Sequence, residues 1–343
     1  MSARASDWAL PDEVVAVRPV PQTAAVPQVT PFSPCLIVNP RSRNASRGLA
    51  ADATALALTH GAEVVSVESP AATRSAVEAI LARRQQPLIV LAGDGTACAI
   101  VDQLSQLTAG AWTPDLLVLA GGRTNLTAVD LGAGGAALPI LKRALLRTTS
   151  DAAVEERCAL RIEQPGSPTR HGFFLAAAVI DSVIRQCHRQ RANGILQGDV
   201  GTFIYLLQLG LRGLSGRSGL SCPPLHVDAG ECGRQQGAIR MLLATTLLHR
   251  KGFLNPYAAR GAGEVRLTSV SANAPRFWRS LPRLVSGRYS PAMTTDNGYL
   301  SGRCEHVQIN GLTHYMLDGE PFEADPSRPV TISAGRRLRF MVP

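Results

Sequence analysis

Hydrophobic and polar positions follow a repeated order along the first half of the chain: a short apolar run, a turn of glycine or small polar residues, then an amphipathic stretch of helical period. The apolar runs predict strands, and the amphipathic stretches predict helices. We expect strands at residues 35–38, 63–67, 88–91 and 116–120, and helices at 49–58, at 73–84, around 100–104 and from about 126. Strands that alternate with helices predict a parallel, doubly wound sheet.

The pattern changes after about Ser150, where short strand-like stretches are separated by Gly, Pro and Asn turns. We expect strands at residues 159–163, 172–180, 238–248, 264–270, 306–309, 313–317, 329–333 and 337–342. A length of 343 residues suits about two domains. The expected division is an α/β domain at 34–150 and a mostly β domain at 151–343, with the last segment a candidate to return to the first domain. Residues 1–33 are proline-rich and are expected to form a flexible extension.

The charge balance favours an anionic partner. Lys and Arg number 35 against 26 Asp and Glu, a formal net charge of +9, which suits nucleic acid, an acidic membrane surface or a phosphorylated ligand. No zinc finger, RNP-like motif or heptad-plus-basic pattern supports nucleic acid. The seven cysteines are scattered without a C-x-x-C pair, which is typical of reduced thiols in a cytoplasmic protein.

A glycine-rich turn, Gly93-Asp94-Gly95-Thr96, follows the strand at 88–91 and opens a helix. Ligands of doubly wound sheets bind beyond the carboxyl ends of the strands, and free backbone N–H groups at a helix N-terminus hold anions. Asp94 would repel a phosphate unless a cation intervened, so the turn favours a nucleotide with Mg²⁺. The alternative is an ordinary strand-to-helix turn.

A second glycine-rich turn spans Gly121 to Asn125. Gly122 is small enough for a ligand to come close to the backbone, and Arg123, Thr124 and Asn125 supply a guanidinium, a hydroxyl and an amide that suit contact with phosphate or ribose. Taken alone, it is also compatible with a generic turn.

The first loop has a similar character. Asn39 ends the first strand, and Arg41, Arg43 and Arg47 follow closely. These groups suit phosphate contact, and a solvated basic loop is the alternative.

A late segment, Leu317 to Pro321, places two carboxylates on either side of a glycine. Asp-Gly between apolar stretches is foremost a hairpin turn. Asp318 and Glu320 are also suited to take a proton from a hydroxyl and to help hold Mg²⁺.

These motifs, taken in order, resemble the diacylglycerol kinase catalytic superfamily, which includes soluble bacterial lipid kinases, sphingosine kinases and ceramide kinases. The resemblance rests on Asn-Pro after the first strand, Gly-Asp-Gly-Thr, Gly-x-Thr-Asn and Leu-Asp-Gly-Glu-Pro, and it extends over about residues 34 to 343. It implies an α/β nucleotide domain, a β-sandwich domain, and ATP-Mg²⁺ that phosphorylates a lipid hydroxyl between them. The substrate implied is diacylglycerol or a ceramide or sphingoid lipid.

The resemblance and the loop chemistry together give an expected site. Asp318 is expected to act as the base with Glu320, Asp94 to take part in catalysis, and Asp94 and Glu320 to hold the metal. The residues expected to contact ATP are Asn39, Arg43, Gly93, Asp94, Gly95, Thr96, Gly122, Thr124 and Asn125.

The chain departs from the family pattern at two acidic positions. Leu126 follows Asn125 where the family has an aspartate, and Arg260-Gly261-Ala262-Gly263 stands where an acidic pair is usual. Ala92 replaces a glycine, a milder change. The two missing acids leave open a catalytically weakened lipid-binding regulatory module. The Gly-Asp-Gly-Thr turn also leaves open an enzyme similar to NAD kinases, against which the late Leu-Asp-Gly-Glu and the basic, aromatic stretch at 276–281 speak.

Residues 251–290 are strongly basic, with seven Lys or Arg and one acid, Glu264. Within them Arg276, Trp278 and Arg279 combine charge with an aromatic ring, which favours an anionic membrane surface. We expect a cytoplasmic protein, peripherally associated with the inner face of the membrane. A solvated loop and a buried Trp278 are the alternatives. Residues 200–214 are a second candidate for acyl-chain contact or, equally, a core helix.

Overall fold

The structure is a computed structural model. It describes residues 32–42, 48–108, 112–121, 126–130, 133–147, 153–179, 222–248 and 255–342, which belong to a single unit of the chain, residues 31–343. The extension expected at 1–33 falls almost wholly outside the described residues, and the apolar stretch at 200–214 falls wholly outside them. The domain limits 34–150 and 151–343 stay predictions.

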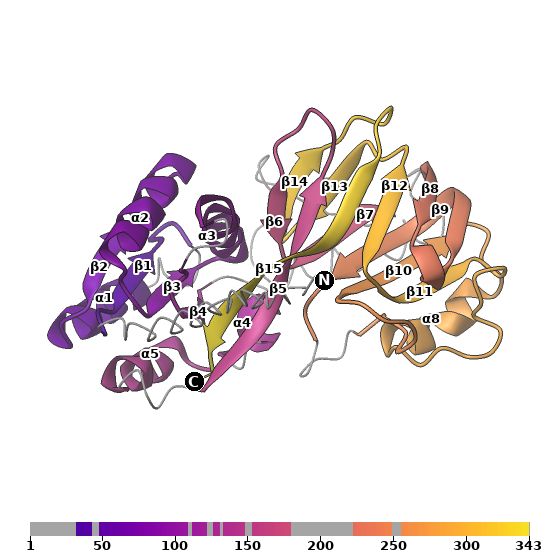
Figure 1. The fold of residues 1–343 in the computed structure, drawn as a ribbon. Coiled ribbons are helices and arrows are strands. Elements are labelled where there is room, and N and C mark those ends of the chain that lie inside the picture. Colours follow the sequence, from indigo (N-terminus) through magenta and orange to yellow (C-terminus); the bar gives the residue numbers. More distant parts are fainter. Residues whose placement is uncertain are drawn as a thin grey trace, which may run out of the picture. The chain divides into compact units, whose positions relative to one another are not determined.

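Four parallel strands form the α/β region (Figure 1). They are β1 (Cys35–Val38), β2 (Glu63–Ser66), β3 (Leu88–Ala92) and β4 (Leu116–Ala120), in the order β4-β3-β1-β2. Every residue of β1 and β3 is buried, because helices cover both faces of the sheet. Both strands are accordingly apolar along their whole length. The predicted α/β fold is confirmed.

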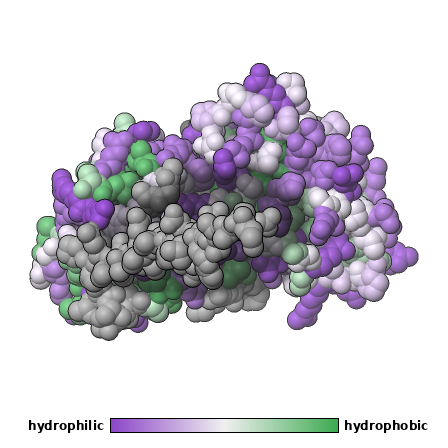
Figure 2. Space-filling view, viewed as in Figure 1, coloured by the Kyte–Doolittle hydropathy of each residue, from purple (hydrophilic) through white to green (hydrophobic). Residues whose placement is uncertain are grey.

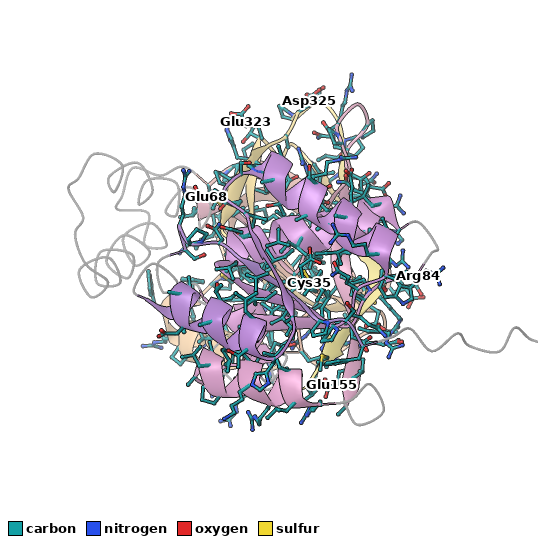
Figure 3. The ribbon with its side chains drawn as sticks, turned by 90° about the vertical axis from the view of Figure 1, so that its left-hand side faces the viewer. Cys35, Glu68, Arg84, Glu155, Glu323 and Asp325 are labelled. Atoms are coloured by element: carbon teal, nitrogen blue, oxygen red, sulfur yellow. The ribbon has the colours of Figure 1, made fainter. Side chains whose placement is uncertain are left out.

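Helices cover this sheet on both faces. They are α1 (Leu49–Thr59), α2 (Pro70–Arg83), α3 (Asp94–Leu107), α4 (Leu126–Asp130) and α5 (Ala137–Leu146). α2 packs against α3, and α1 packs against α5 (Figure 1). α2 begins three residues before the predicted start, because the Ser69 hydroxyl caps it by accepting the Ala72 N–H at 3.2 Å and Pro70 suits its first position. In Figure 3, Cys35 lies in the interior of this region and Arg84 at its periphery.

The second half of the described chain is mostly antiparallel β structure, as predicted. The strands are β5 (Val154–Glu163), β6 (Arg170–Gly172), β7 (Phe174–Ala178), β8 (Pro224–Asp228), β9 (Arg234–Thr245), β10 (Val265–Ser271), β11 (Tyr299–Cys304), β12 (His306–Asn310), β13 (His314–Leu317), β14 (Glu320–Glu323) and β15 (Val330–Met341). The helix α8 (Phe277–Val285), which the sequence pattern did not predict, lies beside β10 and β11 (Figure 1). Hydrophilic side chains cover most of the antiparallel region on the face shown in Figure 2.

The final strand joins the two regions. β15 pairs antiparallel with β5 and β12, and Phe340 near its end pairs in parallel with Leu116 of β4. The two strands expected at 329–333 and 337–342 are one strand, with an irregularity between Ala334 and Arg337. The strand expected at 172–180 is instead divided at Phe173 into β6 and β7. No helix in the described part of the chain is long and apolar enough to cross a bilayer.

Candidate active site

The loop after β1 is tied to the turn after β3. The side-chain amide of Asn39 donates to the Thr96 hydroxyl at 2.8 Å, and its carbonyl oxygen accepts the Arg41 N–H at 2.9 Å. The Ser42 hydroxyl accepts the Gly93 N–H at 2.9 Å. Three of the expected nucleotide residues, Asn39, Gly93 and Thr96, therefore meet at the carboxyl edge of the parallel sheet.

The N-terminus of α3 is built to meet a ligand through its backbone. Gly93 precedes the helix in an extended conformation, and no side chain caps it. The first-turn N–H groups have no partner within a helix, so an anion can accept them. Gly121, the first residue of the second glycine turn, lies against the end of β3, where a Cβ would come within 2.6 Å of the Ala92 carbonyl oxygen. A glycine is required at that close approach.

Glu320 reaches the same turn from the other half of the fold. It is the first residue of β14, and the β13–β14 hairpin brings its carboxylate against the backbone of Gly95, so closely that a Cβ on Gly95 would overlap a carboxylate oxygen. The side chain is exposed, and no hydrogen bond to its carboxylate is recorded among the described residues. Glu320 therefore presents a carboxylate to the N-terminus of α3.

Asp318 has a different environment, although it lies two residues away. It has a φ of 48°, and its two carboxylate oxygens accept the backbone N–H groups of Phe173 at 2.9 Å and Phe174 at 2.8 Å. The Asp318 N–H in turn donates to the Phe174 carbonyl at 2.8 Å. Both carboxylate oxygens thus hold the hairpin to the corner between β6 and β7.

Cys98 of α3 completes this contact. Burial raises the pKa of the Cys98 thiol well above its ordinary value, and the negative charge of the neighbouring Asp318 carboxylate raises it further. Cys98 is therefore neutral, and its thiol donates to the His171 carbonyl oxygen at 3.4 Å, which links α3 to β6 beside the hairpin. Gly172 allows the close packing, because a Cβ there would lie 2.6 Å from an Asp318 carboxylate oxygen.

A pocket of about 450 Å³ opens beside these groups. Its lining joins elements of both regions: Asn39, Glu68, Ser69, Pro70, Thr73, Gly95, Thr96, Cys98, Ala99, Asp102, Gln103, Arg170, His171, Leu317, Glu320, Pro321 and Phe322. Glu68, labelled in Figure 3, forms an ion pair with Arg41, in which Oε2 of Glu68 lies 2.9 Å from Nη2 of Arg41. The pocket therefore contains four of the expected site residues, Asn39, Gly95, Thr96 and Glu320.

Several residues of this pocket were not identified from the sequence. One oxygen of Asp102 accepts both the backbone N–H and Nδ1 of His171, each at 3.0 Å, and the pair is buried. Arg170 places its guanidinium carbon 5.3 Å from the centre of the Phe322 ring. Asp94, Cys98 and Asp102 are four residues apart, and this spacing predicts that they lie on one face of α3. Nothing in the sequence indicates that this face contacts β6.

Other expected residues lie elsewhere or cannot be placed. Arg43, Gly122, Thr124, Asn125 and the side chain of Asp94 fall outside the described residues. Arg260, at the position of a missing acid, is in the antiparallel region, where its Nε donates to the Ser301 carbonyl at 2.7 Å, and it does not line this pocket.

Residues 33–156 match the family model of the diacylglycerol kinase catalytic domain. The resemblance to the diacylglycerol kinase superfamily is confirmed. Similar solved structures come from Bacillus anthracis str. Sterne: a "putative diacylglycerol kinase" with 13% identity and a TM-score of 0.62, and a diacylglycerol kinase with 12% identity and a TM-score of 0.57. Each alignment covers 92% of this chain and 98% of the other, so the diacylglycerol kinase fold extends through both regions. Among curated proteins, none matches this sequence.

Proposed function

We propose that the protein is an ATP-dependent lipid kinase, which transfers the γ-phosphate to the hydroxyl of a membrane lipid, either diacylglycerol or a ceramide or sphingoid lipid. The observation that carries the proposal is the meeting of Glu320 with the uncapped N-terminus of α3, beside a pocket. An anion-binding helix end and a carboxylate are the two groups needed to hold a phosphate and to accept a hydroxyl proton.

The nucleotide phosphates are assigned to the first turn of α3. Its backbone N–H groups and the Thr96 hydroxyl, held by Asn39, face the edge of the sheet where such ligands bind. Arg43, Gly122, Thr124 and Asn125 are proposed to add contacts, on the strength of their sequence positions.

The carboxylate at this turn fits Mg²⁺. The described residues contain no group of three or more His, Cys, Asp or Glu side chains suited to a metal. Mg²⁺ does not require one, since it keeps several waters and takes one or two carboxylates together with substrate phosphates. Glu320 would supply one carboxylate, and Asp94 another by its sequence position. When bound, the ion neutralises charge on the β- and γ-phosphates.

The geometry favours Glu320 as the base and Asp318 as its positioning residue, the reverse of the order expected from the sequence. Both Asp318 oxygens already accept backbone N–H groups, whereas the Glu320 carboxylate faces the pocket. A base must come within hydrogen-bond reach of the proton it removes, with an accessible oxygen. Asp318 fixes the hairpin so that Glu320 stays at the helix end.

A phosphoryl-transfer assay tests the substrate class. The full chain is incubated with γ-labelled ATP, Mg²⁺ and, separately, diacylglycerol, ceramide, sphingosine and NAD. The proposal predicts label in one of the lipids. Label in NAD would instead identify an NAD kinase, and no label in any acceptor would favour the regulatory module.

A matched pair of variants tests whether Glu320 takes part in the reaction, as the base and as a carboxylate that holds Mg²⁺. Glu320→Gln is expected to lower lipid phosphorylation at least ~10²-fold, which is the usual contribution of a general base. Glu323→Gln changes an exposed carboxylate on the same strand, outside the pocket lining, and serves as the control. Equal activity in the two variants would contradict the assignment of Glu320.

A further inference from the structure

The helix α8 presents a basic face to solvent. Residues 272–295 contain four arginines and no acidic residue. Arg276, Arg279 and Arg283 are exposed together with Trp278 and Pro282. No ion pair to these three arginines is recorded within the described residues, so their charge is available to a partner from outside the chain.

Arg240, from strand β9, adds a third guanidinium to those of Arg276 and Arg279. Its guanidinium carbon lies 4.6 Å from the centre of the Phe277 ring, and its Nη2 donates to the Ala272 carbonyl at 2.5 Å. A pocket of about 390 Å³ is lined by Arg240, Ala274, Arg276, Phe277, Trp278 and Arg279. Stacking on an aromatic face orients a guanidinium while leaving it charged. The pocket is therefore cationic with an aromatic wall.

Trp278 is not the core anchor of this helix. The buried side chains of α8 are Phe277 and Leu284, whereas Trp278 is 43% exposed and packs edge-on to Phe277 with ring centres 5.2 Å apart. An exposed indole beside arginines is typical of residues at the headgroup level of a bilayer. The apolar ring and the cations thus lie on one exposed helix face.

We propose that α8 and Arg240 form a docking surface for an anionic membrane, in which a lipid phosphate occupies the cationic pocket and Trp278 enters the headgroup layer. Charge complementarity favours an anionic occupant, because three guanidiniums line a pocket whose lining includes no carboxylate. The inference extends the proposed function, from which it takes the bilayer as the place where the substrate lies. An exposed indole and proline between the arginines suit a bilayer better than a nucleic-acid backbone.

Vesicle co-sedimentation of the full chain tests the surface. Vesicles of phosphatidylcholine alone are compared with vesicles that also contain phosphatidylglycerol, at low and high salt. Each basic residue near an anionic surface contributes ~1 kcal/mol, or about 5-fold in partitioning, so Arg276→Ala with Arg279→Ala should weaken binding to the anionic vesicles roughly 25-fold. The matched control replaces Arg74 and Arg84, two exposed arginines of α2 and its C-cap, and should change binding much less.

The outcomes separate this inference from the kinase proposal, because co-sedimentation needs no turnover. Unchanged binding of the α8 double variant, an equal loss in the α2 control, or equal binding to neutral vesicles would each overturn the docking surface. Any of these can occur in an active lipid kinase, and the predicted result can occur in an inactive one. Near-ultraviolet circular dichroism of each variant shows whether it is folded.

A fluorescence measurement locates the contact. The sequence has three tryptophans, and Trp8→Phe with Trp112→Phe leaves Trp278 as the single reporter. Anionic vesicles should shift its emission to shorter wavelength, because the indole leaves water for the headgroup layer. Binding without a shift would show that another surface docks.

Discussion

Replacing Asp318 with Asn separates the two roles that a carboxylate at this hairpin can have. The native carboxylate accepts one backbone N–H on each oxygen, from Phe173 and from Phe174. An Asn side chain keeps the shape and tolerates the positive φ of 48°, so the turn itself is not strained. Its amide has one acceptor oxygen, and its NH₂ group therefore faces one of the two backbone donors.

The expected cost follows from that lost contact. A hydrogen bond to a charged group contributes about 1.5–3 kcal/mol, so the free energy of unfolding should fall by about 2 kcal/mol. An unfolding entropy of about 2.1 cal/mol/K per residue over 343 residues makes 1 kcal/mol correspond to roughly 1.4 °C, and the melting temperature should fall by about 3 °C. Lipid phosphorylation should fall as well, because the hairpin that carries Glu320 loses one of its attachments.

Thermal unfolding followed by circular dichroism measures the effect, with Glu323→Gln as the control expected to stay within about 1 °C of the parent, the shift of an ordinary surface substitution. The decisive comparison is between stability and turnover in the same preparation. If Asp318→Asn kept the parent melting temperature and lost phosphorylation at least ~10²-fold, Asp318 would be the base itself and Glu320 the supporting residue.

Three further changes test other parts of the site and the fold. Gly95→Ala places a Cβ against the Glu320 carboxylate, which is the end of an exposed side chain and can move away, so calorimetry should show a melting temperature near that of the parent while labelled-phosphate transfer falls at least ~10-fold. Normal transfer would show that Glu320 need not lie at Gly95. Asn39→Ala removes the hydrogen bonds with the Thr96 hydroxyl and the Arg41 N–H, so the free energy of unfolding should fall by about 1 kcal/mol and steady-state kinetics should give a raised KM for ATP. An unchanged KM would show that Asn39 does not contribute to the nucleotide site. Asp130→Asn removes one of the two carboxylates that pair with the buried Arg157, whose Nε lies 3.5 Å from Asp130. Because Glu155 still pairs with Arg157, urea unfolding should show a loss of about 1–2 kcal/mol, whereas a loss above about 3 kcal/mol would show that Asp130 alone compensates the arginine charge.

Local patterns were sufficient for the parallel strands. Residues 35–38 and 88–91 are continuous apolar runs bounded by turn residues, and a run of that kind is buried wherever helices cover both faces of a sheet. The Gly-Asp-Gly-Thr turn was found for the same reason, since a strand, a glycine turn and a helix are contiguous in sequence. The glycines and small residues of this turn indicate a tight strand-to-helix connection without reference to any other part of the chain.

Two elements of the second half were not found. Phe277, Leu281 and Leu284 recur at helical spacing in α8, but the segment has only nine residues and Pro282 inside it, which argues against a helix when the sequence is considered alone. β14 is Glu-Pro-Phe-Glu, which lacks the apolar alternation of a strand and is held by pairing with β13. Both elements depend on tertiary contacts that outweigh weak local preference.

The pairing of side chains across the pocket had no sequence signal. His171 meets Asp102 across 69 positions, and Phe173 meets Asp318 across 145. Each residue alone resembles a common core histidine or turn aspartate. The roles of Asp318 and Glu320 depend on which carboxylate the β6–β7 corner engages, and that corner is remote in sequence from both.

The central claim, transfer of phosphate from ATP to a lipid hydroxyl, is tested most directly by phosphorus NMR of the reaction. The full chain is incubated with ATP, Mg²⁺ and the lipid that accepts label, and the products are quantified together. Transfer to a lipid should give one lipid phosphomonoester for each ADP formed, and both products should be lost in Glu320→Gln. ADP accompanied by inorganic phosphate and no lipid phosphomonoester, or a phosphorylated product other than a lipid, would contradict it.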